Sequence, residues 1–181
     1  LAIEWLTMLI VGARGDAAMV GQLRTALQIT SLINLIVVTF DTVMGPRIAA
    51  AHRVDDRAAI RRTWRNSIVM MIALSAPLLL VCLLLPEWLL GLFGPEFPAA
   101  APALRILIIG QIINVLTGPA GSTLVMTGQE AWSLRISLAA LVLLGALGMT
   151  LIPALGLIGA AWTVTLVIAF RNLAAATIVL R

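Results

Sequence analysis

The sequence is poor in charge. Only 11% of its 181 residues are charged and 61% are hydrophobic, whereas a soluble domain carries about 25% charged residues. A small water-soluble protein must cover its surface with polar groups, and a mean hydropathy of +1.09 leaves too few of them. The composition therefore excludes a soluble monomer and predicts a protein that lies in lipid.

Cysteine and lysine are also scarce. Cys82 is the only cysteine, which excludes an internal disulfide and a cysteine-based zinc site. All twelve basic residues are arginine, and the net charge is +4. Because these arginines cluster at the edges of apolar segments, we expect membrane lipids as their partners and no nucleic acid.

The sequence lacks a catalytic constellation. It shows no nucleophile beside a base, no carboxylate pair other than the adjacent Asp55 and Asp56, and no phosphate-binding loop. His52 has no second histidine or cysteine nearby to share a metal. We therefore predict no catalytic residues, no metal site and no cofactor.

Long uncharged runs are present instead. A membrane-spanning helix needs about 20 apolar residues, and residues 66–86 and 106–129 each supply such a run. The run 136–170 is too long for one helix, and Pro153 and Gly156 indicate a turn within it. We predict an all-α, polytopic membrane helix bundle with five complete transmembrane helices and a truncated first one. The predicted helices span about residues 1–13, 17–46, 65–86, 100–127, 131–152 and 157–180.

The start of the chain favours a fragment. Residues 1–13 are too few to cross a bilayer before Arg14 and Asp16. Residue 1 is Leu rather than Met, and no signal-peptide pattern follows it. We expect one bundle over residues 1–181 that belongs to a longer protein.

The arginines predict the orientation, because cytoplasmic loops carry an excess of Lys and Arg. The loop after the second helix and its flanks hold Arg47, Arg53, Arg57, Arg61, Arg62 and Arg65. Arg135 and Arg181 fall on the same side, whereas Arg14 and Arg105 lie opposite. We expect the arginine-rich side, and with it the C-terminus, to be cytoplasmic.

Two predicted helices carry a polar stripe at the helical period of about 100° per residue. The stripe residues that we take as candidates for lining a cavity are Arg24, Gln28, Asn34 and Asp41 on the second helix and Gln111, Asn114 and Thr117 on the fourth. Polar groups in a membrane helix face either a neighbouring helix or a water-filled cavity. We favour a cavity because Arg24 and Asp41 are ionisable groups that packing does not need.

Glu4 is a further candidate. It lies about 14 Å from the outer end of the first segment, and Arg24 lies about 12 Å inward on its antiparallel neighbour. The two side chains either pair or flank the same cavity, and the spacing leaves both arrangements open. In the fourth helix, Pro119 predicts a bend of the kind that recurs beside transporter cavities.

Six short elements together resemble a family. They are residues 44–49 (MGPRIA), 92–97 (LFGPEF), 104–107 (LRIL), 110–114 (GQIIN), 118–119 (GP) and 126–130 (MTGQE). In their order and spacing the chain resembles the C-terminal half of oligosaccharide flippases, the O-antigen and teichoic-acid exporters of the multidrug/oligosaccharidyl-lipid/polysaccharide superfamily. The resemblance implies a two-bundle transporter that moves undecaprenyl-diphosphate-linked oligosaccharide across the bacterial cytoplasmic membrane. The missing N-terminal half would then be a partner.

Three other functions remain open. A multidrug or small-cation exporter of the same superfamily favours acids over arginines in its cavity. An integral-membrane glycan polymerase or ligase needs a long outer loop, and residues 87–102 are short for that. A membrane scaffold that transports nothing explains the apolar mass but not two polar stripes.

The orientation gives a testable prediction. In a variant without Cys82, a membrane-impermeant thiol reagent added outside the cell should label a cysteine at Ala99 but not one at Ala58. Moving six arginines across the bilayer is opposed by insertion bias and by the membrane potential. Labelling at Ala58 and not at Ala99 would invert the topology.

Overall fold

The computed structural model describes residues 2–13 and 17–179, with side chains from residue 5 onward. Over this part of the chain every regular element is a helix, which confirms the predicted all-α fold class. The elements are α1 (Ala2–Gly12), α2 (Ala17–Arg53), α3 (Arg57–Leu84), α4 (Pro86–Gly91), η1 (Phe97–Ala100), α5 (Ala101–Thr117), α6 (Ala120–Met126) and α7 (Glu130–Val179).

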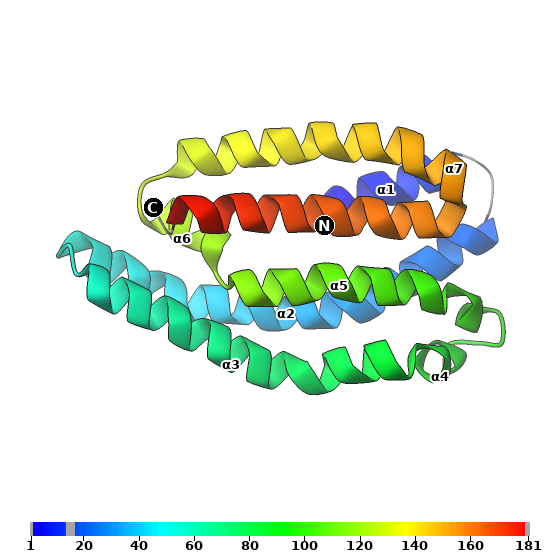
Figure 1. Ribbon diagram of the computed structural model, residues 1–181, viewed down its shortest axis with the longest axis horizontal. Helices are drawn as coiled ribbons and strands as arrows, with labels where there is room; N and C mark the ends of the chain where they lie inside the picture. The colour runs from blue at the N-terminus through cyan, green and yellow to red at the C-terminus, as the bar shows by residue number, and fades with distance from the viewer. Residues whose placement is uncertain (1, 14–16, 180–181) are drawn as a thin grey trace.

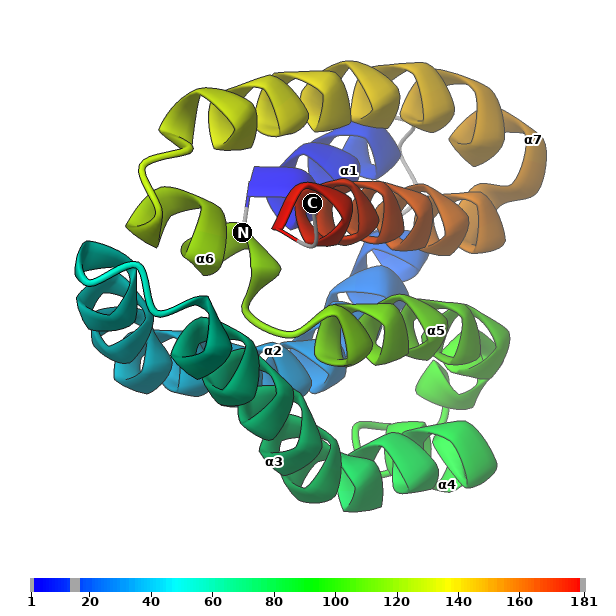
Figure 2. The same cartoon turned by 60° about the vertical axis from the view of Figure 1, so that its left-hand side comes forward.

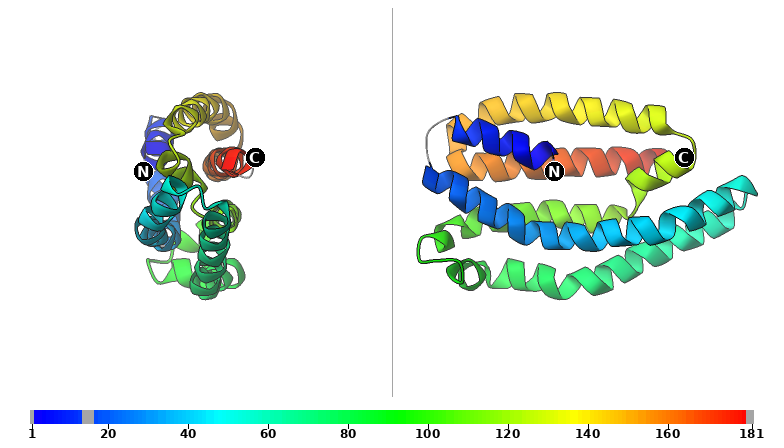
Figure 3. Two further views of the ribbon diagram at one scale, coloured as in Figure 1. Left: turned by 90° about the vertical axis from the view of Figure 1, so that its left-hand side faces the viewer. Right: turned by 180° about the vertical axis from the view of Figure 1, so that it is seen from behind.

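The helices form an elongated bundle with their axes along its length (Figure 1). The hairpin of α2 and α3 extends past the other helices at one end. We call this the arginine-rich end, because Arg53 and Arg57 flank the tip of the hairpin. α6 and both ends of α7 lie toward the same end. The short elements α4 and η1 lie at the opposite end, as the view from behind also shows (Figure 3). The long helices thus connect two ends of different composition.

Four elements of the described chain are long and apolar enough to cross a membrane: Ala17–Arg53, Arg57–Leu84, Phe97–Thr117 and Glu130–Val179. The last of them contains a non-helical residue, Gly156 (φ 56°, ψ −127°), where the chain reverses direction (Figure 1). The two arms of α7, residues 130–155 and 157–179, therefore run antiparallel. The count of five complete helices and one truncated helix stays a prediction.

Apolar side chains fill the interior and also cover the outside. Leu23, Met71 and Leu104, which come from α2, α3 and α5, are fully buried in one cluster. Val142 and Met149 of α7 are 73% and 74% exposed. Such a surface is stable in contact with lipid chains, whereas in water it would be an aggregation site.

The hairpin helices run further than the hydropathy predicts. α2 continues through Pro46 to Arg53, and α3 begins at Arg57 rather than near residue 65. The Asp56 side chain accepts a hydrogen bond from the Ala59 backbone N–H at 2.8 Å and thereby caps the start of α3. α2 and α3 pack against each other, and their hairpin extends past the other helices (Figure 3).

The fourth predicted helix is broken rather than bent. α5 ends at Thr117 and α6 begins at Ala120, and between them Gly118 has φ 62° and ψ −156°, a conformation that is essentially restricted to glycine. A Cβ atom at residue 118 would lie 2.6 Å from Ile68 Cγ1. The break therefore requires glycine for two independent reasons.

Three glycine substitutions separate these reasons. Gly118→Ala should lower the free energy of unfolding by roughly 2–4 kcal/mol, because it adds backbone strain and a clash. Gly128 has φ 73° but open space around it, so Gly128→Ala should cost only about 1 kcal/mol. Gly121 lies within α6 with no atom near its Cβ position, so Gly121→Ala should change stability by less than about 0.5 kcal/mol. Thermal unfolding in detergent measures all three, and equal losses for Gly118→Ala and Gly128→Ala would contradict the clash.

Candidate functional site

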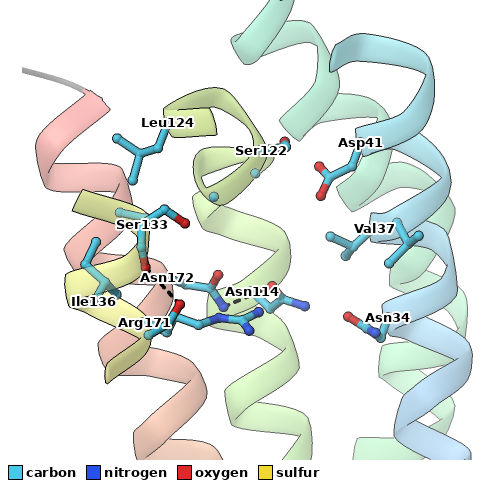
Figure 4. A pocket seen from close by; sticks show the side chains of 15 residues that line it. Asn34, Val37, Asp41, Asn114, Ser122, Leu124, Ser133, Ile136, Arg171 and Asn172 are labelled. Atoms are coloured by element: carbon cyan, nitrogen blue, oxygen red, sulfur yellow. Dashed lines mark hydrogen bonds between the residues drawn. The ribbon is translucent and has the colours of Figure 1, made fainter. Parts of the chain in front are cut away.

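A pocket of about 310 Å³ lies between α2, α5, α6 and both arms of α7 (Figure 4). Its polar lining consists of Asn34, Asp41, Asn114, Ser122, Ser133, Ser137, Arg171 and Asn172. The break at Gly118 positions α6 over this pocket, and Gly118, Gly121 and Ser122 contribute directly to its wall. A polar pocket thus lies within an otherwise apolar bundle.

The ionisable groups of the pocket lie within the membrane-spanning helices. Arg171 precedes the end of α7 by eight residues, or about 12 Å along the helix. Asp41 precedes the end of its predicted membrane span at residue 46 by five residues, or about 8 Å. Because ionisable side chains are costly at such depth, they usually mark a path for a substrate or an ion.

One wall of the pocket is fixed by a chain of amide hydrogen bonds. Asn172 Nδ2 donates to Asn114 Oδ1 at 3.0 Å, and Asn114 Nδ2 donates to Gln111 Oε1 at 3.2 Å. All three side chains are buried, and together they connect α7 to α5. Further along the same helix pair, the Thr165 hydroxyl donates to the Ile106 carbonyl at 2.9 Å. This wall is therefore rigid and already hydrogen-bonded.

The opposite charges of the pocket face each other without contact. The guanidinium of Arg171 extends from α7 toward Asn114, and Asp41 points inward from α2 (Figure 4). Among the described residues, the ion pairs within 4.0 Å are Arg57–Asp55 and Arg105–Glu87. One oxygen of the Asp41 carboxylate, Oδ1, is buried and has no hydrogen-bond partner. The pocket thus separates a cation from an incompletely satisfied anion.

The structure brings some of the sequence candidates together. Asn34, Asp41 and Asn114 line the pocket, and Gln111 lies behind Asn114 in the amide chain. The Thr117 hydroxyl donates to its own helix, to the carbonyls of Ile113 at 2.9 Å and Asn114 at 3.0 Å. The polar side chains of α5 therefore face α7. They do not line a cavity that runs along the whole polar stripe of α2.

The other candidates lie apart from the pocket. Arg24 and Gln28 are exposed on α2 and do not line it, while the apolar face that includes Leu27 and Ile33 is buried. Glu4 belongs to α1, and its side chain is outside the described residues. The two stripes thus meet only near Asn34, Asp41 and Asn114, and substrate binding by any candidate stays a prediction.

Sequence reasoning missed Arg171 and Asn172. Both residues lie in the predicted span 157–180, which is otherwise apolar apart from threonines. The available signal was the arginine itself, since an arginine inside a predicted membrane helix indicates a functional position. Its partners were not predictable, because the turn predicted at Gly156 does not determine which faces of the neighbouring helices meet.

The helical bundle and its polar pocket indicate the class of protein to which the chain belongs. A helical membrane protein with a pocket that holds ionisable groups within the spanning helices is typical of transporters. Among the described residues, no group of three or more His, Cys, Asp or Glu side chains is arranged to hold a metal ion. The site offers charges and amides for binding a polar substrate.

Comparison with known proteins identifies the family. The sequence model of the MatE family matches residues 2–151, and the chain belongs to this family. The chain is also similar to a protein of Haloferax volcanii named "Probable flippase AglR", with 25% identity over 166 residues. That alignment covers 89% of this chain but 34% of the relative, so the chain spans about a third of its length. No solved structure matches the chain.

These two matches confirm the predicted resemblance at the level of the superfamily. Arg171 and Asn172 lie beyond the residues that the family model matches, so their part in the pocket comes from the structure.

The amide chain gives a testable prediction. A double-mutant cycle of Asn114→Ala and Asn172→Ala should give a coupling of roughly 0.6–1.7 kcal/mol, the range for hydrogen bonds between membrane helices. Asn66 is exposed on α3, so Asn66→Ala combined with Asn172→Ala should be additive within about 0.5 kcal/mol. Additivity in the first cycle would show that the bond between Asn172 and Asn114 does not stabilise the bundle.

Proposed function

We propose that the chain is part of a flippase that moves undecaprenyl-diphosphate-linked oligosaccharide across the bacterial cytoplasmic membrane, for the synthesis of cell-surface polysaccharide. Membership in the MatE family and similarity to a probable flippase support a transporter of this kind. The observation that carries the choice of cargo is Arg171, an arginine that lines a pocket inside the membrane-spanning helices.

The chemistry of the pocket suits such a cargo. A guanidinium binds two phosphate oxygens through a planar fork, and it is less strongly hydrated than an ammonium group. The amides of Asn34 and Asn114 and the hydroxyls of Ser133 and Ser137 also line the pocket, and such groups exchange hydrogen bonds with sugar hydroxyls. Phosphate and sugar would therefore find their partners on neighbouring walls.

A multidrug or small-cation exporter is the second candidate. The observation that favours it is Asp41, whose Oδ1 atom is buried without a hydrogen-bond partner and would attract a cation. Arg171 in the same pocket opposes this candidate, because a like charge nearby raises the cost of binding a cation. A glycan polymerase or ligase is less suited, since the segment that would have to form its long outer loop consists largely of α4 and η1.

The proposal includes an orientation and a partner. Arg53, Arg57 and Arg135 lie toward the arginine-rich end, whereas Arg105 and Glu87 lie at the opposite end. The arginine-rich end, and the C-terminus with it, would be cytoplasmic and would contact anionic lipid. Alternating access requires two bundles that move around a shared site, so a second bundle of the same protein would complete the cavity and cover the exposed Arg24.

Transport by the protein encoded in the complete reading frame tests the proposal. In proteoliposomes, Arg171→Ala should lower the flipping rate of a fluorescent lipid-linked sugar by about tenfold or more, because a charge-assisted hydrogen bond is lost. Arg171→Lys should restore the rate only in part, since an ammonium does not form the planar fork. Arg105→Ala, at the opposite end, is the matched control and should transport normally.

Normal flipping by Arg171→Ala would remove the proposed role of this arginine in cargo binding. Export of a small organic cation that depends on Asp41, with no flipping of the lipid-linked sugar, would instead establish the second candidate.

A further inference from the structure

One oxygen of the Asp41 carboxylate lacks a hydrogen-bond donor in the described structure. This oxygen, Oδ1, is buried without a partner, and the hydroxyl that faces the carboxylate is that of Ser122 (Figure 4). The Ser122 hydroxyl donates to the Pro119 carbonyl at 3.0 Å, and it does not satisfy Oδ1 of Asp41. Because a buried carboxylate oxygen without a donor is costly, the pocket is electrostatically incomplete on the α2 side.

Arg171 presents the opposite requirement. A guanidinium offers five N–H donors and no acceptor, and Arg171 extends into the pocket from the α7 side (Figure 4). A single ligand that satisfies both walls must therefore bring acceptor oxygens to Arg171 and a hydrogen-bond donor to Asp41. A purely anionic ligand satisfies the first wall and is repelled by the second.

The size of the pocket limits the ligand further. Its volume of about 310 Å³ is at the lower end of small-molecule pockets and corresponds to roughly ten water molecules. A sugar ring with one phosphate fits such a volume, whereas an oligosaccharide does not. The pocket can therefore contact only the part of a larger cargo where phosphate and hydroxyl groups adjoin.

We propose that this pocket binds the junction between a phosphate and a hydroxyl-bearing group, with Arg171 on the phosphate and Asp41 as the specificity-determining acceptor for a hydroxyl. The inference rests on the proposed function for its cargo and deepens it by assigning a separate role to Asp41. A hydroxyl donor satisfies Oδ1 of Asp41, and a phosphate without one leaves this oxygen unpaired beside a second anion. Asp41 thus selects among anions that Arg171 alone would accept.

Three soluble probes test this in the purified protein encoded by the complete reading frame. Glucose 1-phosphate carries both groups, methyl phosphate has no carbon-borne hydroxyl, and methyl glucoside has no phosphate. Glucose 1-phosphate should bind about tenfold or more tightly than either of the others, which is the scale of one hydrogen bond to a charged group. Equal affinity for glucose 1-phosphate and methyl phosphate, or no binding of either, would overturn the proposal.

Substitutions of Asp41 and Arg171 test which side chain binds the hydroxyl and which binds the phosphate. Asp41→Asn should reduce the preference for glucose 1-phosphate over methyl phosphate to less than about threefold, and Arg171→Gln should weaken both phosphates. Asp41→Ser removes the same carboxylate and replaces Asp41→Asn if that protein is unstable. Asp55→Asn is the control, because Asp55 pairs with Arg57 at the exposed tip of the hairpin. A preference that survives the loss of the Asp41 carboxylate would refute the assignment.

Two lipids that both carry a phosphate beside a hydroxyl-bearing group show whether the pocket binds a phospholipid headgroup or a lipid-linked sugar. Short-chain phosphatidylglycerol has a hydroxyl-bearing phosphate in its headgroup, and a short isoprenyl phosphate linked to glucose has one in a lipid-linked sugar. The proposal predicts that the isoprenyl glucose phosphate displaces glucose 1-phosphate about tenfold more effectively than phosphatidylglycerol does. The reverse order would make the pocket a phospholipid site and would overturn the assignment to cargo.

The binding and transport assays test the two proposals independently of each other. If the preference for glucose 1-phosphate depends on Asp41 but no lipid-linked sugar is flipped, the pocket chemistry stands and the proposed function fails. If lipid-linked sugar is flipped but Asp41→Asn leaves the preference intact, the proposed function stands and the role of Asp41 fails.

Discussion

At the break after α5, the Gly118 N–H donates to the Val115 carbonyl at 3.2 Å, the Ala120 N–H donates to the Gly118 carbonyl at 2.8 Å and the Thr117 hydroxyl donates to the Asn114 carbonyl at 3.0 Å. Lipid offers no partner to a free backbone group, so a helix can break inside a membrane only where the protein satisfies the exposed groups itself. Here the residues at the break supply those donors. The position of α6 and the shape of the pocket depend on this local solution.

The break has consequences for both sides of the pocket. α6 leaves the line of α5 and crosses toward α7 (Figure 2), which opens space between α2 and the second arm of α7. The break also places Ser122 opposite Asp41 (Figure 4), yet Oδ1 of Asp41 stays without a hydrogen-bond partner. The helix break thus forms one wall of the pocket and leaves one carboxylate oxygen of the opposite wall unsatisfied.

Sequence reasoning predicted the parts of the molecule that depend on local signals. Hydropathy indicated the long helices, and Pro119 indicated the irregularity after α5. Helical periodicity also indicated the polar residues Asn34, Asp41 and Asn114, but it gives only the face that a residue occupies and not the neighbour opposite that face. The contact of Asn114 with Asn172 joins residues more than fifty positions apart. The sequence predicts the turn at Gly156 but not which faces of the helices meet after it, so it reveals neither this contact nor the approach of Arg171.

The reversal of α7 also orders events during synthesis. The second arm, which carries Arg171, is the last helical segment of the described chain to be made, roughly 130 residues after Asp41. At about 5–20 residues per second, the ribosome needs on the order of ten seconds to cover that distance. During this interval the nascent bundle contains the carboxylate but not its opposing cation, so a chain that stops early retains an uncompensated charge in the membrane. Completion of the pocket and completion of the described chain are thus the same event.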